Sequence, residues 1–221
     1  SDSIFKRSFR YSEMFWLEVI GVIAFGICGA MAAMERGADL FGVLFLAVIT
    51  ALGGGVIRDV LLGWFPPRMF TSYAYIAIAV CSALLVFLDA CIRREHYRQN
   101  RDKLDSFVNV FDALGLGVFT VSGVQMAIDQ YGMGNPLLLA FMGMTTGIGG
   151  GMLRDVLIDA MPKVLRKRIY ALASLAGAIG YYLLLRFGVD QTLSTIIITV
   201  LITALRILAT VFKWNMPQAK L

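Results

Sequence analysis

"GGGVIRDVL" occupies residues 53–61 and "GGGMLRDVL" occupies residues 149–157, so nearly the same nine-residue motif occurs twice, 96 positions apart. The two copies differ only at their fourth and fifth positions. Three consecutive glycines are unfavourable in a helix, and ionisable side chains such as arginine and aspartate are costly inside a membrane. A chain that repeats this combination has a specific structural or functional use for it.

The sequence around the motif has the composition of an integral membrane protein. Of the 221 residues, 58% are hydrophobic and the mean hydropathy is +0.74, whereas soluble domains contain about 45–50% apolar residues. Apolar stretches long enough to cross a bilayer, which takes about 20 residues, recur along the chain. Seven spans are predicted: 15–34, 39–62, 72–91, 108–128, 136–158, 168–186 and 191–212. They leave no room for a separate soluble domain.

Other functional classes find little support in the sequence. The net charge of +5 comes from basic residues in short connecting segments, which is typical of membrane orientation rather than of a nucleic-acid-binding face. Cys28, Cys81 and Cys91 lie in or at the end of apolar spans without CxxC spacing, so we expect packing residues rather than a disulfide or a metal site. His96 lies in a charged run and is expected to be solvated. No HExxH, GxSxG or Walker-type motif is present, so we expect no enzyme, catalytic residue, metal or cofactor.

The distribution of basic residues predicts an orientation. One set of connections holds Lys6, Arg7, Arg10, Arg68 and Arg186. The other set holds Arg36, Arg93, Arg94, Arg98, Arg101, Lys103, Lys163, Arg166, Lys167, Arg168, Lys213 and Lys220. Lysine and arginine accumulate in cytoplasmic loops. We therefore expect a multi-pass protein of the cell inner (plasma) membrane, with its N-terminus outside and its C-terminus in the cytoplasm.

The repeated motif belongs to a longer internal repeat. With a shift of 94, Glu18, Gly21, Phe25, Gly29 and Ala33 align with Asp112, Gly115, Phe119, Gly123 and Ala127. With a shift of 96, Phe45, Thr50 and Pro66 align with Phe141, Thr146 and Pro162. Each repeat contains three spans, an odd number, so the second repeat enters the membrane from the opposite side. Architectures with such inverted repeats place their transport pathway where the repeats meet.

These observations predict an all-α integral membrane protein with two inverted three-helix repeats and a seventh helix. A single transmembrane domain covers residues 1–221. Repeat one is expected at about 15–91, repeat two at about 108–186 and the seventh helix at about 191–212.

The glycine runs allow two interpretations. Gly53, Gly54, Gly55, Gly149, Gly150 and Gly151 can serve close helix packing, as the small residues Gly21, Gly29, Gly115 and Gly123 also suggest. Alternatively, each run kinks or breaks its helix, and the exposed carbonyl groups line a polar path. The adjacent charges favour the second interpretation.

Arg58, Asp59, Arg154 and Asp155 lie on the same helical sides as the glycines. Adjacent residues of one helix do not face each other, so each arginine should pair with an acid from another span. Glu18 and Asp112 are the candidates. Ionisable groups inside spans indicate a pathway or gate, and a purely structural ion-pair network is the alternative. Arg206 in the last span can join this network or bind a lipid headgroup.

The seven spans, the three-plus-three inverted repeat and the paired GGGxxRD blocks resemble the bacterial family described as glycine transporters, which is related to the trimeric intracellular cation (TRIC) channels. The resemblance extends from about Phe15 to Phe212. It implies a homotrimer among membrane lipids, in which each protomer has its own pore for monovalent cations such as potassium, kinked at the glycines of the second and fifth spans. The positions that carry over are Gly53, Gly54, Gly55, Arg58, Asp59, Gly149, Gly150, Gly151, Arg154 and Asp155.

Two alternative functions are therefore predicted. The first is a cation channel, whose permeant ion is potassium or sodium; no TVGYG-type filter is present, so weak selection between them is expected. The second is a secondary transporter for glycine or a similar small solute. In that case Arg58 or Arg154 would bind a carboxylate, and Glu18 or Asp112 would carry a proton. The sequence alone does not separate channel from carrier.

Overall fold

The computed structural model describes the backbone of residues 2–166, 169–212 and 214, and their side chains except those of 2–13, 96, 98, 101–103 and 166. Several side chains in the orientation argument lie outside this description: Lys6, Arg7, Arg10, Arg98, Arg101, Lys103, Arg166, Lys167, Arg168, Lys213 and Lys220. His96 also lies outside it.

The described chain is a bundle of helices without strands, and seven of its helices are long and apolar enough to cross a membrane. They are α1 (Asp2–Glu35), α2 (Leu40–Leu61), α4 (Tyr73–Ile92), α6 (Arg101–Tyr131), α7 (Pro136–Leu157), α9 (Ile169–Arg186) and α10 (Gln191–Val211). Short helices α3 (Arg68–Thr71), α5 (Arg94–Gln99) and α8 (Lys163–Arg166) lie in the connections. The predicted spans are confirmed, although the apolar part of α6 is longer than expected and covers Leu104–Tyr131.

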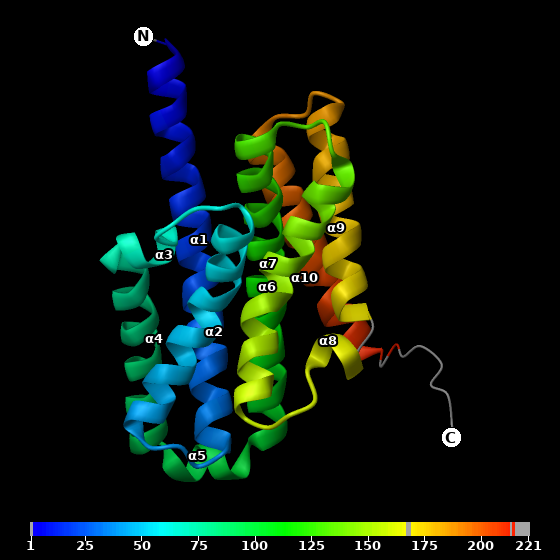
Figure 1. The fold of residues 1–221 in the computed structure, drawn as a ribbon. Coiled ribbons are helices and arrows are strands. Elements are labelled where there is room, and N and C mark those ends of the chain that lie inside the picture. Colours follow the sequence, from blue (N-terminus) through cyan, green and yellow to red (C-terminus); the bar gives the residue numbers. More distant parts are fainter. Residues whose placement is uncertain (1, 167–168, 213, 215–221) are drawn as a thin grey trace.

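The helices of the two halves run in opposite directions. In Figure 1, α1 descends from the end at which the N-terminus lies, whereas α6 ascends from the other end, and the pairs α2/α7 and α4/α9 are reversed in the same way. Helix α1 packs against α6, and α2 packs against α7, so the halves meet along these four helices. The predicted fold class is confirmed. The repeat boundaries stay a prediction from the sequence.

Polar side chains before the helices set several of their starting points. Asp39 accepts a hydrogen bond from the backbone N–H of Gly42 (2.8 Å) at the start of α2. Asn135 and Asp190 cap α7 and α10 in the same way, at 3.1 Å each. Such caps satisfy N–H groups that have no partner within the helix. The helices that carry the two motifs therefore start at defined positions.

The glycine runs lie inside continuous helices. Helix α2 passes unbroken through Gly53–Gly55, and α7 passes unbroken through Gly149–Gly151. A Cβ atom on Gly54 would overlap the carbonyl oxygen of Thr146, and one on Gly150 would overlap the carbonyl oxygen of Thr50. The helices are therefore not broken at the glycines, whereas a kink there stays a prediction. Glycine is present here because the backbones of α2 and α7 touch.

Candidate functional site

The two Arg-Asp pairs lie at opposite ends of the bundle. Arg58 and Asp59 are in the last turns of α2, and Arg154 and Asp155 are in the last turns of α7. Because these helices run in opposite directions (Figure 1), the pairs are brought to opposite ends of the surface between the halves. All four side chains are buried, with at most 4% of each residue exposed.

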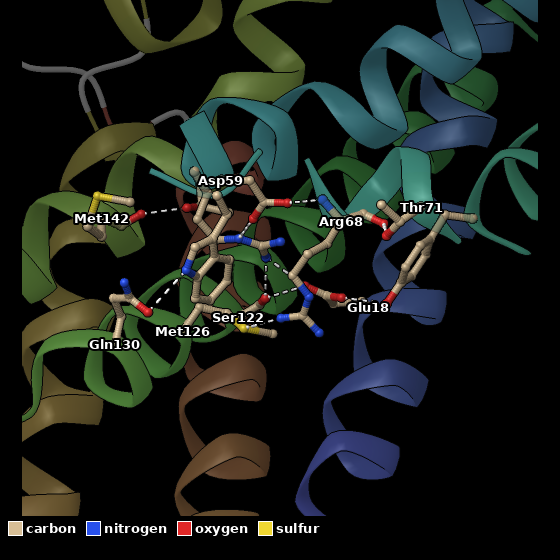
Figure 2. A network of polar contacts seen from close by, with 12 residues as sticks. Glu18, Asp59, Arg68, Thr71, Ser122, Met126, Gln130 and Met142 are labelled. Carbon is tan, nitrogen blue, oxygen red and sulfur yellow. Dashed lines mark hydrogen bonds and ion pairs between the residues drawn. The ribbon is translucent and has the colours of Figure 1, made fainter. Parts of the chain in front are cut away.

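The Arg58 cluster consists of Glu18, Arg58, Asp59, Tyr75 and Ser122, and hydrogen bonds and ion pairs join its members. Figure 2 shows this network, with Glu18, Asp59 and Ser122 labelled. Arg58 Nη1 contacts Glu18 Oε1 at 2.6 Å and donates to Ser122 Oγ at 2.9 Å. Ser122 donates to the same Glu18 oxygen at 2.7 Å, and Tyr75 donates to Glu18 Oε2, also at 2.7 Å. Four helices thus converge on one carboxylate, because Glu18, Arg58, Tyr75 and Ser122 come from α1, α2, α4 and α6.

The Arg154 cluster, which consists of Asp112, Arg154, Asp155, Lys163 and Tyr170, occupies the other end. Arg154 Nη1 contacts Asp112 Oδ1 at 2.9 Å, and Lys163 Nζ lies 3.4 Å from the same oxygen. Asp112 is completely buried. The predicted pairings of Arg58 with Glu18 and of Arg154 with Asp112 are therefore present.

Each arginine also pairs with its neighbour in sequence, contrary to our expectation. Arg58 Nε donates to Asp59 Oδ1 at 2.8 Å, and Arg154 Nε donates to Asp155 Oδ1 at 2.9 Å. The chain that follows each helix provides the physical reason. Asp59 Oδ2 accepts the backbone N–H of Arg68 (2.7 Å), and Asp155 Oδ2 accepts that of Lys163 (2.9 Å). The returning loop holds each carboxylate beside its guanidinium, so the rule for a helix surface does not apply at this end.

The tyrosines of the two clusters differ in their hydrogen bonding. Tyr75 reaches Glu18, but the hydroxyl of Tyr170 and Asp112 Oδ2 are both buried without a hydrogen-bond partner in the described part of the chain. The guanidinium of Arg206 lies over the Tyr170 ring, 4.5 Å from its centroid. Because Arg206 is only 2% exposed, this contact favours its membership of the buried network over lipid-headgroup binding.

Ser122, Tyr75 and Lys163 were missed by the sequence reasoning. One signal was available: Tyr75 lies 16 residues after Asp59, and Tyr170 lies 15 residues after Asp155. A tyrosine thus follows each motif at nearly the same distance. Ser122 carried no such signal, because its equivalent at a shift of 94 is Cys28.

The cysteines and acids do not form a metal site in the part of the chain that is described. No group of three or more His, Cys, Asp or Glu side chains there is arranged to hold a metal ion. The three cysteines are free thiols. Cys28 is buried and donates to the carbonyl oxygen of Val108 (3.3 Å), as expected of a packing residue, whereas Cys81 and Cys91 are exposed on α4. Among the three, only Cys28 packs inside the protomer.

The unequal tyrosines lead to a prediction. We expect Tyr75→Phe to lower the free energy of unfolding by about 1–3 kcal/mol, because it leaves a buried carboxylate oxygen of Glu18 without its donor. Tyr170→Phe removes a hydroxyl that makes no such bond and should have a much smaller effect. Thermal unfolding of both variants in the same detergent measures the difference. Equal losses would mean that the Tyr75 hydrogen bond contributes little.

The sequence matches a known family over most of its length. The family model described as "Glycine transporter" matches residues 15–90 and 109–186. A UPF0126 membrane protein of Deinococcus radiodurans is 39% identical over 171 residues, which cover 76% of this chain and 75% of that protein. The UPF0126 inner membrane protein YadS of Escherichia coli K12 is 37% identical over 166 residues, covering 75% and 76% of the two chains.

The fold agrees with the sequence comparison. The crystal structures of the TRIC trimeric intracellular cation channel orthologue from Rhodobacter sphaeroides superimpose with a TM-score of 0.81 at 30% sequence identity. The match covers 92% of this chain and all of the other. From the sequence relatives and this structural likeness together, the chain belongs to the membrane protein family described as glycine transporter, and it has the fold of the TRIC channels.

Proposed function

We propose that this protein is a cation channel that conducts monovalent cations through each protomer. One observation carries the proposal: two buried clusters of acids and arginines lie at opposite ends of the surface where the two halves meet. Ionisable groups inside a membrane protein are costly and face a partner or a pathway. Inverted-repeat proteins use the surface between their repeats for transport. The likeness to a TRIC cation channel from Rhodobacter sphaeroides supports the same function.

The proposed path runs along α2 and α7. In this proposal the path passes beside the contact of these two helices, and the glycines that permit this contact or border it would line the path: Gly53, Gly54, Gly55, Gly149, Gly150 and Gly151. The acids Glu18 and Asp59 at one end, and Asp112 and Asp155 at the other, would attract cations. Each arginine pairs with both acids of its own end in the structure, so the clusters act as gates in this proposal.

Potassium and sodium are the proposed permeant ions, with weak selection between them. The sequence contains no TVGYG-type carbonyl filter that would replace the hydration shell of potassium.

A carrier of glycine is the second candidate, because the matching family model bears that description. In such a carrier an arginine would bind the carboxylate of the substrate. The arginines here are already occupied: Arg154 uses Nε, Nη1 and Nη2 on Asp112 and Asp155. Arg58 uses Nε and Nη1, and only its Nη2 lacks a partner among the described residues. At Arg154 a substrate carboxylate would have to displace a buried acid of the protein, and at Arg58 it would find one free nitrogen instead of the two that a bidentate contact uses, which favours the channel.

Recording from purified protein in a planar lipid bilayer tests the function. A channel gives discrete current steps in symmetrical potassium chloride, and the reversal potential in a potassium–sodium gradient measures selectivity. Saturable uptake of glycine into vesicles without current steps would favour the carrier instead.

We propose a homotrimer, because the structurally similar channel from Rhodobacter sphaeroides is described as trimeric. Large apolar side chains such as Phe45 and Phe141 are about half exposed in the protomer, and a neighbouring protomer or lipid would cover them. Mass measurement in mild detergent should give three times the protomer mass of 24.3 kDa. A monomer or a dimer would contradict the proposal.

We also propose an inner-membrane location with the N-terminus outside. The Escherichia coli relative YadS is named an inner membrane protein. In Figure 1, α5 and α8 lie at the end opposite the N-terminus, and both belong to connections rich in lysine and arginine. By the positive-inside rule this end faces the cytoplasm. A phosphatase reporter that works only outside the cytoplasm should stay inactive when fused after Leu221. Activity of that fusion would reverse the orientation.

A further inference from the structure

Two phenylalanines meet at the centre of the surface between the halves. Phe25 of α1 and Phe119 of α6 stack with their ring centroids 5.3 Å apart and an angle of 25° between the ring planes. They are 0% and 1% exposed. The two residues occupy equivalent positions in the internal repeat, at a shift of 94. The stack is therefore a contact between the two halves that is made by the same residue of each repeat.

Each ring lies over a glycine of the opposite helix. A Cβ atom on Gly115 of α6 would overlap the Phe25 ring, and one on Gly21 of α1 would lie 2.9 Å from Phe119 Cε2. A Cβ atom on Gly150 of α7 would lie 3.3 Å from Phe25 Cδ2. The rings thus occupy the space that glycine leaves on α1 and α6, and one of them also borders the glycine run of α7.

The stack lies between the two charged clusters. Along α1, Phe25 comes seven residues after Glu18, which corresponds to about 10 Å at 1.5 Å per residue. Along α6, which runs in the opposite direction, Phe119 comes seven residues after Asp112 and three before Ser122 of the Arg58 cluster. A path along this surface from one cluster to the other therefore passes the level of the stacked rings.

We propose, resting on the channel function above, that Phe25 and Phe119 form the dehydrating barrier of the permeation path and set its conductance. The stacked pair consists of two buried aromatic rings, and neither side chain has an oxygen atom that could replace the water around a cation. Water leaves apolar constrictions of this kind, and a hydrated cation cannot follow until the rings separate. In this proposal the charged clusters gate the two ends of the path, and the phenylalanines form a separate apolar barrier between them.

The test compares currents of the full-length protein with those of Phe25→Ala and Phe119→Ala in planar bilayers. Each substitution opens the apolar layer and is expected to raise the mean current about tenfold, which corresponds to about 1.4 kcal/mol less barrier. Phe25→Leu and Phe119→Leu keep an apolar side chain and create a smaller cavity. They serve as a second pair of variants in case the alanine variants fail to fold. They should raise the current by a smaller factor.

Phe87→Ala is the matched control, because Phe87 packs partly buried beside α4 residue Ala83, in a cluster away from the stacked pair. It removes the same ring and should leave the current unchanged. If the wild type conducts and the folded Phe25 and Phe119 variants show unchanged or lower currents, the barrier is refuted while the channel function stands. If the wild type is silent and the variants conduct, the barrier is supported. If all of them are silent, the channel function and the barrier both fail.

Discussion

Valine in place of Gly54 or Gly150 should abolish ion flux. In both positions the new Cβ would overlap a backbone carbonyl oxygen of the facing helix, that of Thr146 or that of Thr50. A backbone atom cannot move aside as a flexible side chain can, so α2 and α7 must separate. Overpacking of a tight core costs about 1–3 kcal/mol, and we expect values at or above the upper end. Loss of flux in a protein that is still inserted but less stable is the expected result.

Flux into vesicles and thermal unfolding in detergent measure the two effects together. Gly134→Val is the matched control, since a Cβ atom at that position meets nothing within 4 Å. It should leave both quantities unchanged. Normal flux in both Gly54→Val and Gly150→Val would mean that the contact between α2 and α7 is not needed for transport.

Arg58→Ala should destabilise the protein by about 3–5 kcal/mol, because removal of one partner leaves buried charges uncompensated. Glu18 and Asp59 would both lose the guanidinium that they share. Arg154→Ala should have a smaller effect, because Lys163 Nζ remains 3.4 Å from Asp112 Oδ1. The two repeated arginines are thus expected to be unequal.

Unfolding and single-channel recordings of both arginine variants test this difference. Since the clusters lie at opposite ends of the path, the two substitutions should also alter inward and outward currents differently. Arg93→Ala, which breaks an exposed pair with Asp89, serves as the control and should change neither stability nor current. If both buried variants keep wild-type stability, currents and rectification, the repeated motif is neither an ion-pair network nor part of the pathway.

The large-scale fold could be predicted because it depends on length and hydropathy. Spans of about 20 apolar residues and a repeat with an odd number of them determine the inverted bundle. The partners of Arg58 and Arg154 could also be predicted, since Glu18 and Asp112 were the acids at equivalent positions in other spans. Both predictions needed only the hydropathy of the sequence and its internal repeat.

The details that depend on interatomic distances could not be predicted. A glycine run is compatible with a broken helix and with two touching backbones, and only the position of the Thr146 carbonyl oxygen beside Gly54 decides between them. The contact of Arg58 with Asp59 depends on where the following loop returns, which the helical pattern does not contain. The pattern of the chain also does not show that Tyr75 makes a hydrogen bond to its acid while the Tyr170 hydroxyl has no partner among the described residues.

The composition of the two clusters has a consequence for biosynthesis. The charged side chains of the Arg58 cluster, Glu18, Arg58 and Asp59, all belong to the first half, and those of the Arg154 cluster, Asp112, Arg154, Asp155 and Lys163, all belong to the second half. Each half can therefore neutralise its arginine in the bilayer while the other is still being made. The contacts of α2 with α7 and of Phe25 with Phe119 can form only after both halves have been synthesised. A half that pairs its buried arginine with its own acids is also what a gene duplication needs, since such a unit can first exist as a separate chain that pairs with an inverted copy of itself.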